Sequence, residues 1–201
     1  MHLWLIRHGE THGNQAGILR GAASAGDELS ERGHAQAQAL AGRLAAASPR
    51  PQAVYASTYR RAQQTAEPLA RALGLPVQVR PDLQEVDCGD WAGRPYADLK
   101  TAVHDLRLPG GGLGFRGGET FEQIAARFVQ ALEGLPQDQE AAVVSHGGIL
   151  RIGLAALLGR DIEEVWMQGE LVLGNTDYVL LEKLNGEWSL QSNRRDENFT
   201  I

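Results

Sequence analysis

Short apolar runs alternate with longer amphipathic stretches in the first half of the chain. Residues 2–6 are largely apolar and lead straight into a polar, glycine-containing stretch, a pattern typical of a buried strand that ends in a functional loop. Leucines and alanines at helical spacing follow Ser30, a good helix cap, and a second such stretch stops at Gly74. The expected elements are a strand over 2–6, a helix over 30–47, a strand over 53–56 and a helix over 58–73.

The second half continues this alternation and ends in a hairpin. Thr120 and Gln123 form a capping box at the start of one helix, and Asn185 with Gly186 is a turn pair that joins antiparallel strands. The expected elements are strands over 77–79, 141–145, 171–173, 176–184 and 188–191, and helices over 95–106, 120–132 and 147–158. The whole pattern predicts a three-layer α/β/α sandwich with a mostly parallel central sheet.

The composition is that of an ordinary globular protein with one domain, which we expect to span residues 1–201. Hydrophobic residues make up 43% of the chain, and no linker or repeat divides it. The formal net charge of −6 argues against nucleic acid or an anionic membrane as the partner, because both favour a basic face. Cys88 is the single cysteine, and the sequence shows neither a signal-peptide pattern nor a membrane span. We therefore expect a cytoplasmic protein.

Histidines directly follow two of the expected strands. His8 lies in the run RHG at residues 7–9, and His146 lies in the run SHGG at residues 145–148. In open α/β sheets ligands bind at the carboxyl ends of strands, and glycine there, such as Gly147, lets the backbone approach a ligand closely. We expect the two imidazoles to face one site.

Phosphate transfer to an imidazole requires a neutral nucleophilic nitrogen and cations around the phosphoryl oxygens. The sequence has no metal-binding motif, so we expect no metal and no other cofactor, and arginine with histidine supplies the positive charge. Arg7 adjoins His8, and Arg60 and Arg61 lie early in a helix that follows a strand. A phosphate site at His8 is therefore expected.

The leaving oxygen also needs a proton, which a carboxyl group in a partly apolar loop would supply. Glu85 in the run LQEVD fits this role, with Asp87 and Asp90 as rivals. Spacing alone leaves the choice among these three carboxyl groups open.

Five ordered blocks of the chain resemble the signature of the histidine phosphatase superfamily, also called the phosphoglycerate mutase-like family. The blocks are LIRHGET followed by Asn14, SxxxRAxxTA at 57–66, LxExDxGxWxG at 83–93, GGET at 117–120 and VSHGG at 144–148. The resemblance covers most of the chain and implies the phosphoglycerate mutase-like fold.

The resemblance also implies roles for the matched residues. His8 is similar to the phosphorylated nucleophile, His146 to the second imidazole that stabilises the transferring group, and Glu85 to the acid. The second block aligns Arg61, and not Arg60, with the family's phosphate clamp. The phosphate-binding positions that the resemblance implies are Arg7, Asn14, Arg61, His146 and Gly147.

The family resembled contains both phosphatases and mutases. Its mutases carry extra segments after the catalytic glutamate, an ERHY segment and a longer C-terminal tail. This chain has only 33 positions from Glu85 to Gly118 and a short segment after its last hairpin. We expect a phosphomonoesterase that hydrolyses a small phosphorylated metabolite through a phosphohistidine on His8. The alternatives are a 2,3-bisphosphoglycerate-dependent phosphoglycerate mutase and an inactive phosphate-binding regulatory module.

The sequence leaves the identity of the substrate and the oligomeric state open. The expected partner is a small-molecule phosphate ester, and a homodimer is among the options. The glycine-rich stretch 109–118 lacks the motifs of a phosphate-binding loop. Two interpretations of this stretch are open. It is a mobile flap whose Phe115 or Arg116 contacts the substrate, or it is a simple flexible connection. Specificity is expected from residues 12–27, 94–116 and the segment near Asn175.

Overall fold

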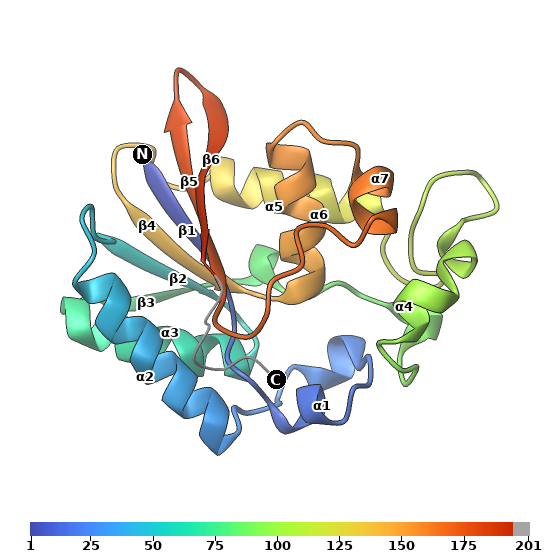
Figure 1. Ribbon diagram of the computed structural model, residues 1–201, viewed down its shortest axis with the longest axis horizontal. Helices are drawn as coiled ribbons and strands as arrows, with labels where there is room; N and C mark the ends of the chain where they lie inside the picture. The colour runs from blue at the N-terminus through green and yellow to red at the C-terminus, as the bar shows by residue number, and fades with distance from the viewer. Residues whose placement is uncertain (195–201) are drawn as a thin grey trace.

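One six-stranded sheet, in the order β3-β2-β4-β1-β5-β6, runs through the centre of the computed structural model, which describes residues 1–194 (Figure 1). The strands are β1 (His2–Arg7), β2 (Ala53–Ser57), β3 (Val77–Arg80), β4 (Ala141–Ser145), β5 (Tyr178–Leu184) and β6 (Glu187–Arg194). Strands β1 to β4 are parallel, whereas β5 and β6 are antiparallel to their neighbours. The prediction of a mostly parallel sheet is confirmed.

Helices cover both faces of the sheet (Figure 1). Helices α2 (Glu31–Ala45) and α3 (Arg60–Leu73) lie on one face, and α5 (Phe121–Glu133) and α6 (Gly147–Leu157) lie on the other. Alternate side chains of β1 explain this arrangement, since they point to opposite faces of a strand. Leu3 and Leu5 join the buried cluster beneath α5 and α6, while Trp4 and Ile6 join the cluster beneath α2 and α3. The three-layer α/β/α architecture is therefore confirmed.

The helix ends are capped where the sequence predicts. The Ser30 hydroxyl accepts a hydrogen bond from Gly33 N, and the capping box of Thr120 and Gln123 is complete. Gly74 ends α3 in the left-handed conformation, with a φ of 69°. These local signals set the boundaries of the long helices.

The segments that lie above the carboxyl ends of the strands differ from the prediction. The expected helix over 95–106 is broken into α4 (Asp98–Thr101) and a 3-10 helix, η4 (Val103–Leu106). The backbone leaves the helical conformation at Ala102, with a φ of −114° and a ψ of 32°, which separates the two short helices. The expected strand over 171–173 is wrong, because Leu171 turns the chain with a φ of 53°.

Several short elements complete the fold. The sequence did not predict α7 (Ile162–Met167), whose first turn is capped by Asp161. The remaining short helices are α1 (His12–Gln15), η1 (Gly21–Ser24), η2 (Pro81–Leu83) and η3 (Gly89–Trp91). In the part of the chain that the structure describes, no helix has the length and apolar character to cross a membrane. The segment 195–201, which follows the last hairpin, lies outside the described residues.

Candidate active site

The register of β1 and β4 brings His8 and His146 together. Arg7 pairs with Ser145 in the parallel ladder, and His8 N donates to Ser145 O at 3.0 Å. The two imidazoles follow at the same level, with ring centroids 5.2 Å apart. The expectation that both rings meet at one edge of the sheet is confirmed.

Two hydrogen bonds fix the tautomer of His8. Its Nδ1 lies 2.7 Å from Gly9 O, which can only accept, so Nδ1 carries the proton. Its Nε2 then accepts a hydrogen bond from Arg61 Nε at 3.0 Å. Complete burial lowers the pKa of His8 well below 6.5, and the charges of Arg61 and Arg7 lower it further. The ring is therefore neutral, with its lone pair on Nε2.

Arg61 reaches His8 from the first turn of α3. Its Nη1 donates to Ser24 O at 2.6 Å, and burial lowers the pKa of the guanidinium. Arg60 instead lies on the surface, 3.5 Å from Glu28. Of the two candidate arginines, the structure places Arg61 at His8.

Arg7 and His146 carry buried nitrogens without a protein partner. Arg7 Nη1 donates to Leu173 O at 2.6 Å, but Arg7 Nε has no hydrogen-bond partner among the described residues, and neither has His146 Nδ1. Burial and the nearby charge of Arg61 lower the pKa of His146 well below 6.5. His146 is fully buried and does not itself line the pocket beside His8. Unpartnered buried nitrogens of this kind mark a place for an acceptor, such as a phosphoryl oxygen.

The loop that carries His8 is held by side chains from two helices. Gly9 N donates to Thr65 Oγ1 at 2.9 Å, and Glu10 N donates to Gln36 Oε1 at 2.8 Å. A Cβ atom at Gly33 would lie only 2.0 Å from Glu10 O, so this close approach requires glycine. The position of His8 is therefore fixed by its neighbours.

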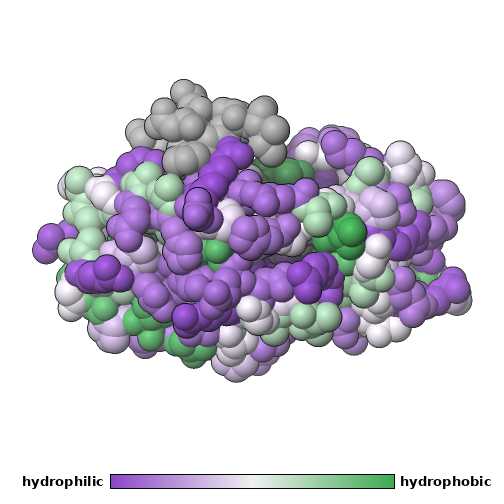
Figure 2. Space-filling view, turned by 90° about the horizontal axis from the view of Figure 1, so that it is seen from below, coloured by the Kyte–Doolittle hydropathy of each residue, from purple (hydrophilic) through white to green (hydrophobic). Residues whose placement is uncertain are grey.

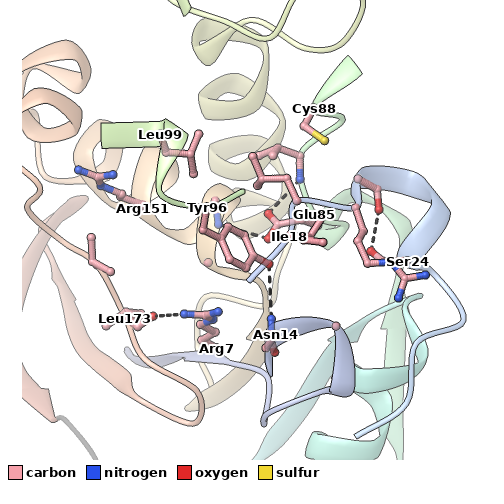
Figure 3. Close-up of a pocket in the computed structure, with 18 of the residues that line it drawn as sticks. Arg7, Asn14, Ile18, Ser24, Glu85, Cys88, Tyr96, Leu99, Arg151 and Leu173 are labelled. Carbon is pink, nitrogen blue, oxygen red and sulfur yellow. Dashed lines mark hydrogen bonds between the residues drawn. The ribbon is translucent and has the colours of Figure 1, made fainter. Parts of the chain in front are cut away.

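Asn14 lines the pocket (Figure 3), and Asn175 orients its side chain. The Nδ2 of Asn175 donates to His8 O at 3.0 Å and to Asn14 Oδ1 at 3.2 Å. The amide nitrogen of Asn14 consequently points toward Tyr96, whose hydroxyl lies 3.5 Å away. The sequence predicts that the segment near Asn175 contributes to substrate specificity. In the structure, the side chain of Asn175 holds the loop that carries His8.

Glu85 is the carboxyl group at the pocket. It lines the cavity with Gly147 and Gly148, and its carboxylate accepts hydrogen bonds from Gly148 N at 3.3 Å and Ile149 N at 3.1 Å. Asp87 and Asp90 are exposed and lie outside the pocket lining. The structure thus places Glu85, and neither rival, beside His8.

The family model of the histidine phosphatase superfamily (branch 1) matches residues 3–195 of the chain. The chain belongs to this superfamily. Together with the named phosphatase relatives below, this match makes the protein a phosphatase of the histidine phosphatase superfamily, as the sequence predicted.

Similar proteins of this superfamily differ in their named substrates. An adenosylcobalamin/alpha-ribazole phosphatase of Escherichia coli (strain K12) is 37% identical over 176 residues, which cover 83% of each chain. A metal-independent phosphoserine phosphatase of Arabidopsis thaliana is 36% identical over 162 residues, which cover 73% of this chain and 64% of the relative. The solved structure of a mycobacterial glucosyl-3-phosphoglycerate phosphatase with VO3 has a TM-score of 0.79 at 26% identity, covering 97% of this chain and 99% of that one.

An ion pair that sequence reasoning missed holds the Glu85 loop of this histidine phosphatase. Arg127 of α5 binds both carboxylate oxygens of Glu119 at 2.9 Å, and Glu119 Oε2 accepts a hydrogen bond from Asp87 N at 2.8 Å. Arg127 Nη1 also donates to Gln84 O at 2.9 Å. The GGET block pointed to Glu119 as a matched position, but nothing in the sequence marked Arg127.

The end of the glycine-rich stretch 109–118 is fixed to the body of the histidine phosphatase. Phe115 is 2% exposed, and its ring packs against Trp91, Phe121 and Trp166 while also lining the pocket. Arg116 does not line the pocket.

Within residues 1–194, no group of three or more His, Cys, Asp or Glu side chains could hold a metal ion.

Proposed function

We propose that this histidine phosphatase is a phosphomonoesterase that works through a phosphohistidine on Nε2 of His8. The observation that carries the proposal is the neutral tautomer of His8, whose Nδ1 donates to Gly9 O and whose Nε2 faces Arg61. When the phosphoryl group binds, the Nε–H of Arg61 turns from Nε2 to a phosphoryl oxygen, and the neutral imidazole then presents its lone pair to phosphorus.

In the first step, Nε2 of His8 attacks phosphorus, and the bond from phosphorus to the ester oxygen breaks. Arg7 and Arg61 neutralise the phosphoryl oxygens, and His146 and Asn14 donate hydrogen bonds to them. The backbone at Gly147, which has no side chain in the way, lies close to the phosphate and completes the site. Glu85 gives its proton to the leaving oxygen, so the alcohol departs uncharged.

In the second step, water hydrolyses the phosphohistidine. The carboxylate of Glu85 takes a proton from the water, which attacks phosphorus and releases inorganic phosphate and neutral His8. Glu85 is then protonated again, ready for the next ester. Water enters through the same pocket as the departing alcohol, because Glu85 lines that pocket.

A labelling experiment tests the intermediate. Incubation with a phosphoryl-labelled ester followed by rapid denaturation is expected to give an acid-labile, base-stable phosphohistidine. The variant His8→Ala abolishes both label and turnover, whereas His104→Ala, which removes an exposed histidine, keeps both. Label that survives in His8→Ala would rule out His8 as the nucleophile.

A second experiment separates hydrolysis from mutase activity. Phosphate release from a panel of phosphomonoesters is measured with and without 2,3-bisphosphoglycerate, alongside conversion of 3-phosphoglycerate to 2-phosphoglycerate. Release from several esters without conversion supports the phosphatase, and EDTA is expected to leave the rate unchanged. Conversion that depends on 2,3-bisphosphoglycerate would instead support the mutase.

The acid is tested by comparing two carboxyl groups. Glu85→Gln is expected to slow hydrolysis of alkyl phosphates far more than that of p-nitrophenyl phosphate, because only the alkyl oxygen needs a proton to leave. Asp87→Asn is the matched control and keeps the wild-type dependence on the leaving group. The reverse result would assign the acid to Asp87.

A further inference from the structure

The pocket beside His8 is much larger than a phosphate group. Its volume is about 740 Å³, within the range of pockets that enclose whole drug-sized ligands. Figure 3 shows Arg7 and Asn14 on one side of this pocket and Leu99 and Arg151 on the other, with Tyr96 between them. The alcohol part of an ester bound at His8 therefore lies toward Leu99 and Arg151.

Exposed apolar side chains gather at this pocket. Among the side chains whose exposure the structure describes, seven large apolar ones are exposed, and four of the seven line the pocket, namely Ile18, Tyr96, Met167 and Val172. Figure 2 shows a face of the molecule that is mainly hydrophilic, with small and scattered apolar patches. Exposed apolar side chains that cluster in a concave site mark a binding surface.

Main-chain hydrogen bonds hold the first apolar wall in place. Ile18 forms an isolated β-bridge with Pro95, and Tyr96 N donates to Gly17 O at 2.8 Å. The two segments that carry Ile18 and Tyr96 therefore support each other. The wall is already formed before a substrate binds, which lowers the entropic cost of binding.

The second wall carries Met167 and Val172, and Arg151 holds it. The guanidinium of Arg151 lies over the ring of Trp166, 4.4 Å from its centroid. It also donates to three main-chain carbonyls of this wall at 2.7–2.9 Å, those of Val165, Trp166 and Glu170. Arg151 thus supports the backbone of this wall, and because carbonyls carry no net charge, its positive charge remains at the pocket that it lines.

The pocket also carries positive charge away from the phosphate site. Besides the two arginines at His8, the described residues that line it include three cations, Arg20, Lys100 and Arg151. Arg20 is paired with Asp27 at 2.8 Å, whereas the partners of Arg151 are uncharged carbonyls. The apolar walls therefore select the alcohol by its apolar area and not by a lack of charge.

From these contacts we infer that the alcohol part of the substrate is bulky and largely apolar, and that it lies along the two walls that carry Tyr96 and Val172. This inference rests on the proposed phosphomonoesterase function. It names the substrate class of the same site, and Ile18 and Met167 extend the surface that recognises it.

Three primary alkyl esters with similar leaving groups test the inference: ethyl phosphate, 2-(2-naphthyl)ethyl phosphate and O-phosphoserine. We expect kcat/KM for the naphthyl ester to exceed that for ethyl phosphate roughly 30-fold or more, from the apolar area that the ring buries. O-Phosphoserine, which carries no apolar ring, is expected to have a lower kcat/KM than the naphthyl ester. Equal values for the ethyl and naphthyl esters, or a preference for phosphoserine, would overturn the inference.

Two valines with nearly equal exposure provide matched variants. Val172 in the pocket is 48% exposed, and Val79 on β3, outside the pocket lining, is 45% exposed. Val172→Ser is expected to reduce the ratio of naphthyl to ethyl kcat/KM roughly three- to tenfold, while Val79→Ser keeps the ratio. An unchanged ratio in Val172→Ser would overturn the assignment of this wall.

The failure of the proposed function has a different signature. If neither these esters nor p-nitrophenyl phosphate release phosphate and no phosphohistidine forms, the phosphomonoesterase itself is wrong and the inference falls with it. If p-nitrophenyl phosphate and ethyl phosphate are hydrolysed without any gain from the naphthyl ring, only the inference is overturned.

Discussion

The hydroxyl oxygen of Ser57 lies 2.8 Å from Nε2 of His146, at the end of the neighbouring strand β2. Ser57 Oγ also accepts a hydrogen bond from Tyr59 N at 3.2 Å, so its proton is available for His146 Nε2. That arrangement leaves the proton of His146 on Nδ1, the buried nitrogen without a protein partner. Ser57 is therefore a positioning residue that sets the tautomer of His146.

The variant Ser57→Ala tests this relationship. Without the hydroxyl, His146 can place its proton on either nitrogen, so we expect kcat to fall roughly tenfold or more with a smaller change in KM. The unpaired buried nitrogen also costs about 1–3 kcal/mol of unfolding free energy. Steady-state kinetics and denaturant unfolding measure the two effects. Ser189→Ala on the exposed hairpin is the control, and a Ser57→Ala enzyme with wild-type kcat would contradict the role.

The ion pair of Arg127 and Glu119 is expected to act on turnover through the loop that carries Glu85. Replacing Arg127 with Met removes the hydrogen bonds that join α5 to this loop at Glu119, Gln84 O and Asp82 O. We expect kcat for ethyl phosphate to fall roughly tenfold, with a smaller loss for p-nitrophenyl phosphate, because only the former depends on a well-placed acid.

A general loss of stability would slow both esters alike, so the ratio of the two rates distinguishes positioning from unfolding. Arg71→Met, on the exposed side of α3, is the matched control and keeps the wild-type ratio. Equal losses for the two esters in Arg127→Met would show that the ion pair does not orient Glu85.

The meeting of His8 with His146 follows from local signals. Each histidine ends an apolar run, and parallel strands place such ends at the same edge of a sheet, so the sequence predicts the site before any contact is known. Arg127 gives no comparable signal, because an arginine in the middle of a helix usually lies on the solvated face. Its role comes from contacts with Glu119 and Gln84 that are distant in the chain.

The walls of the pocket were predicted poorly for a similar reason. The expected helix over 95–106 and strand over 171–173 lie in segments that bury single apolar side chains, such as Leu106 and Leu173, without a repeating buried pattern. Their conformation depends on long-range hydrogen bonds, such as that from Arg7 to Leu173 O. Periodicity reports only which face of a segment is buried, so it carries little information where tertiary contacts decide the backbone.

Cys88 is expected to resist alkylation in the folded protein. It is buried beside Gly21, and burial raises the pKa of its thiol to about 11. At pH 8 only about one thiol in a thousand is then a thiolate, the reactive form. We expect iodoacetamide to label the native protein at least about 100-fold more slowly than the unfolded one, as measured by mass spectrometry. A Cys88→Ser, Ser189→Cys protein is the exposed control, and rapid labelling of native Cys88 would contradict the prediction.

The two buried histidines are expected to make the unfolding free energy depend on pH. Burial lowers the pKa of both His8 and His146 below the value of 6.5 that applies to an unfolded histidine. Below pH 6.5 the unfolded chain therefore binds protons at these histidines, whereas the native protein does not. The unfolding free energy consequently decreases as the pH falls. Above about pH 7.5 both states are neutral at these positions, so this contribution to the slope disappears.

Urea unfolding in phosphate-free buffer between pH 7.5 and 5 measures this slope. Each histidine contributes at most about 1.4 kcal/mol per pH unit, so His8→Asn is expected to flatten the slope by up to that amount. His34→Asn, which removes an exposed histidine, is the control and retains the wild-type slope. Because the pKa of His8 is lowered, we expect no loss of kcat/KM centred at the ordinary histidine pKa of 6.5. Two results together would contradict the lowered pKa: a loss of kcat/KM centred at pH 6.5, and an unfolding slope that His8→Asn leaves unchanged. They would show that His8 takes up a proton in the native enzyme.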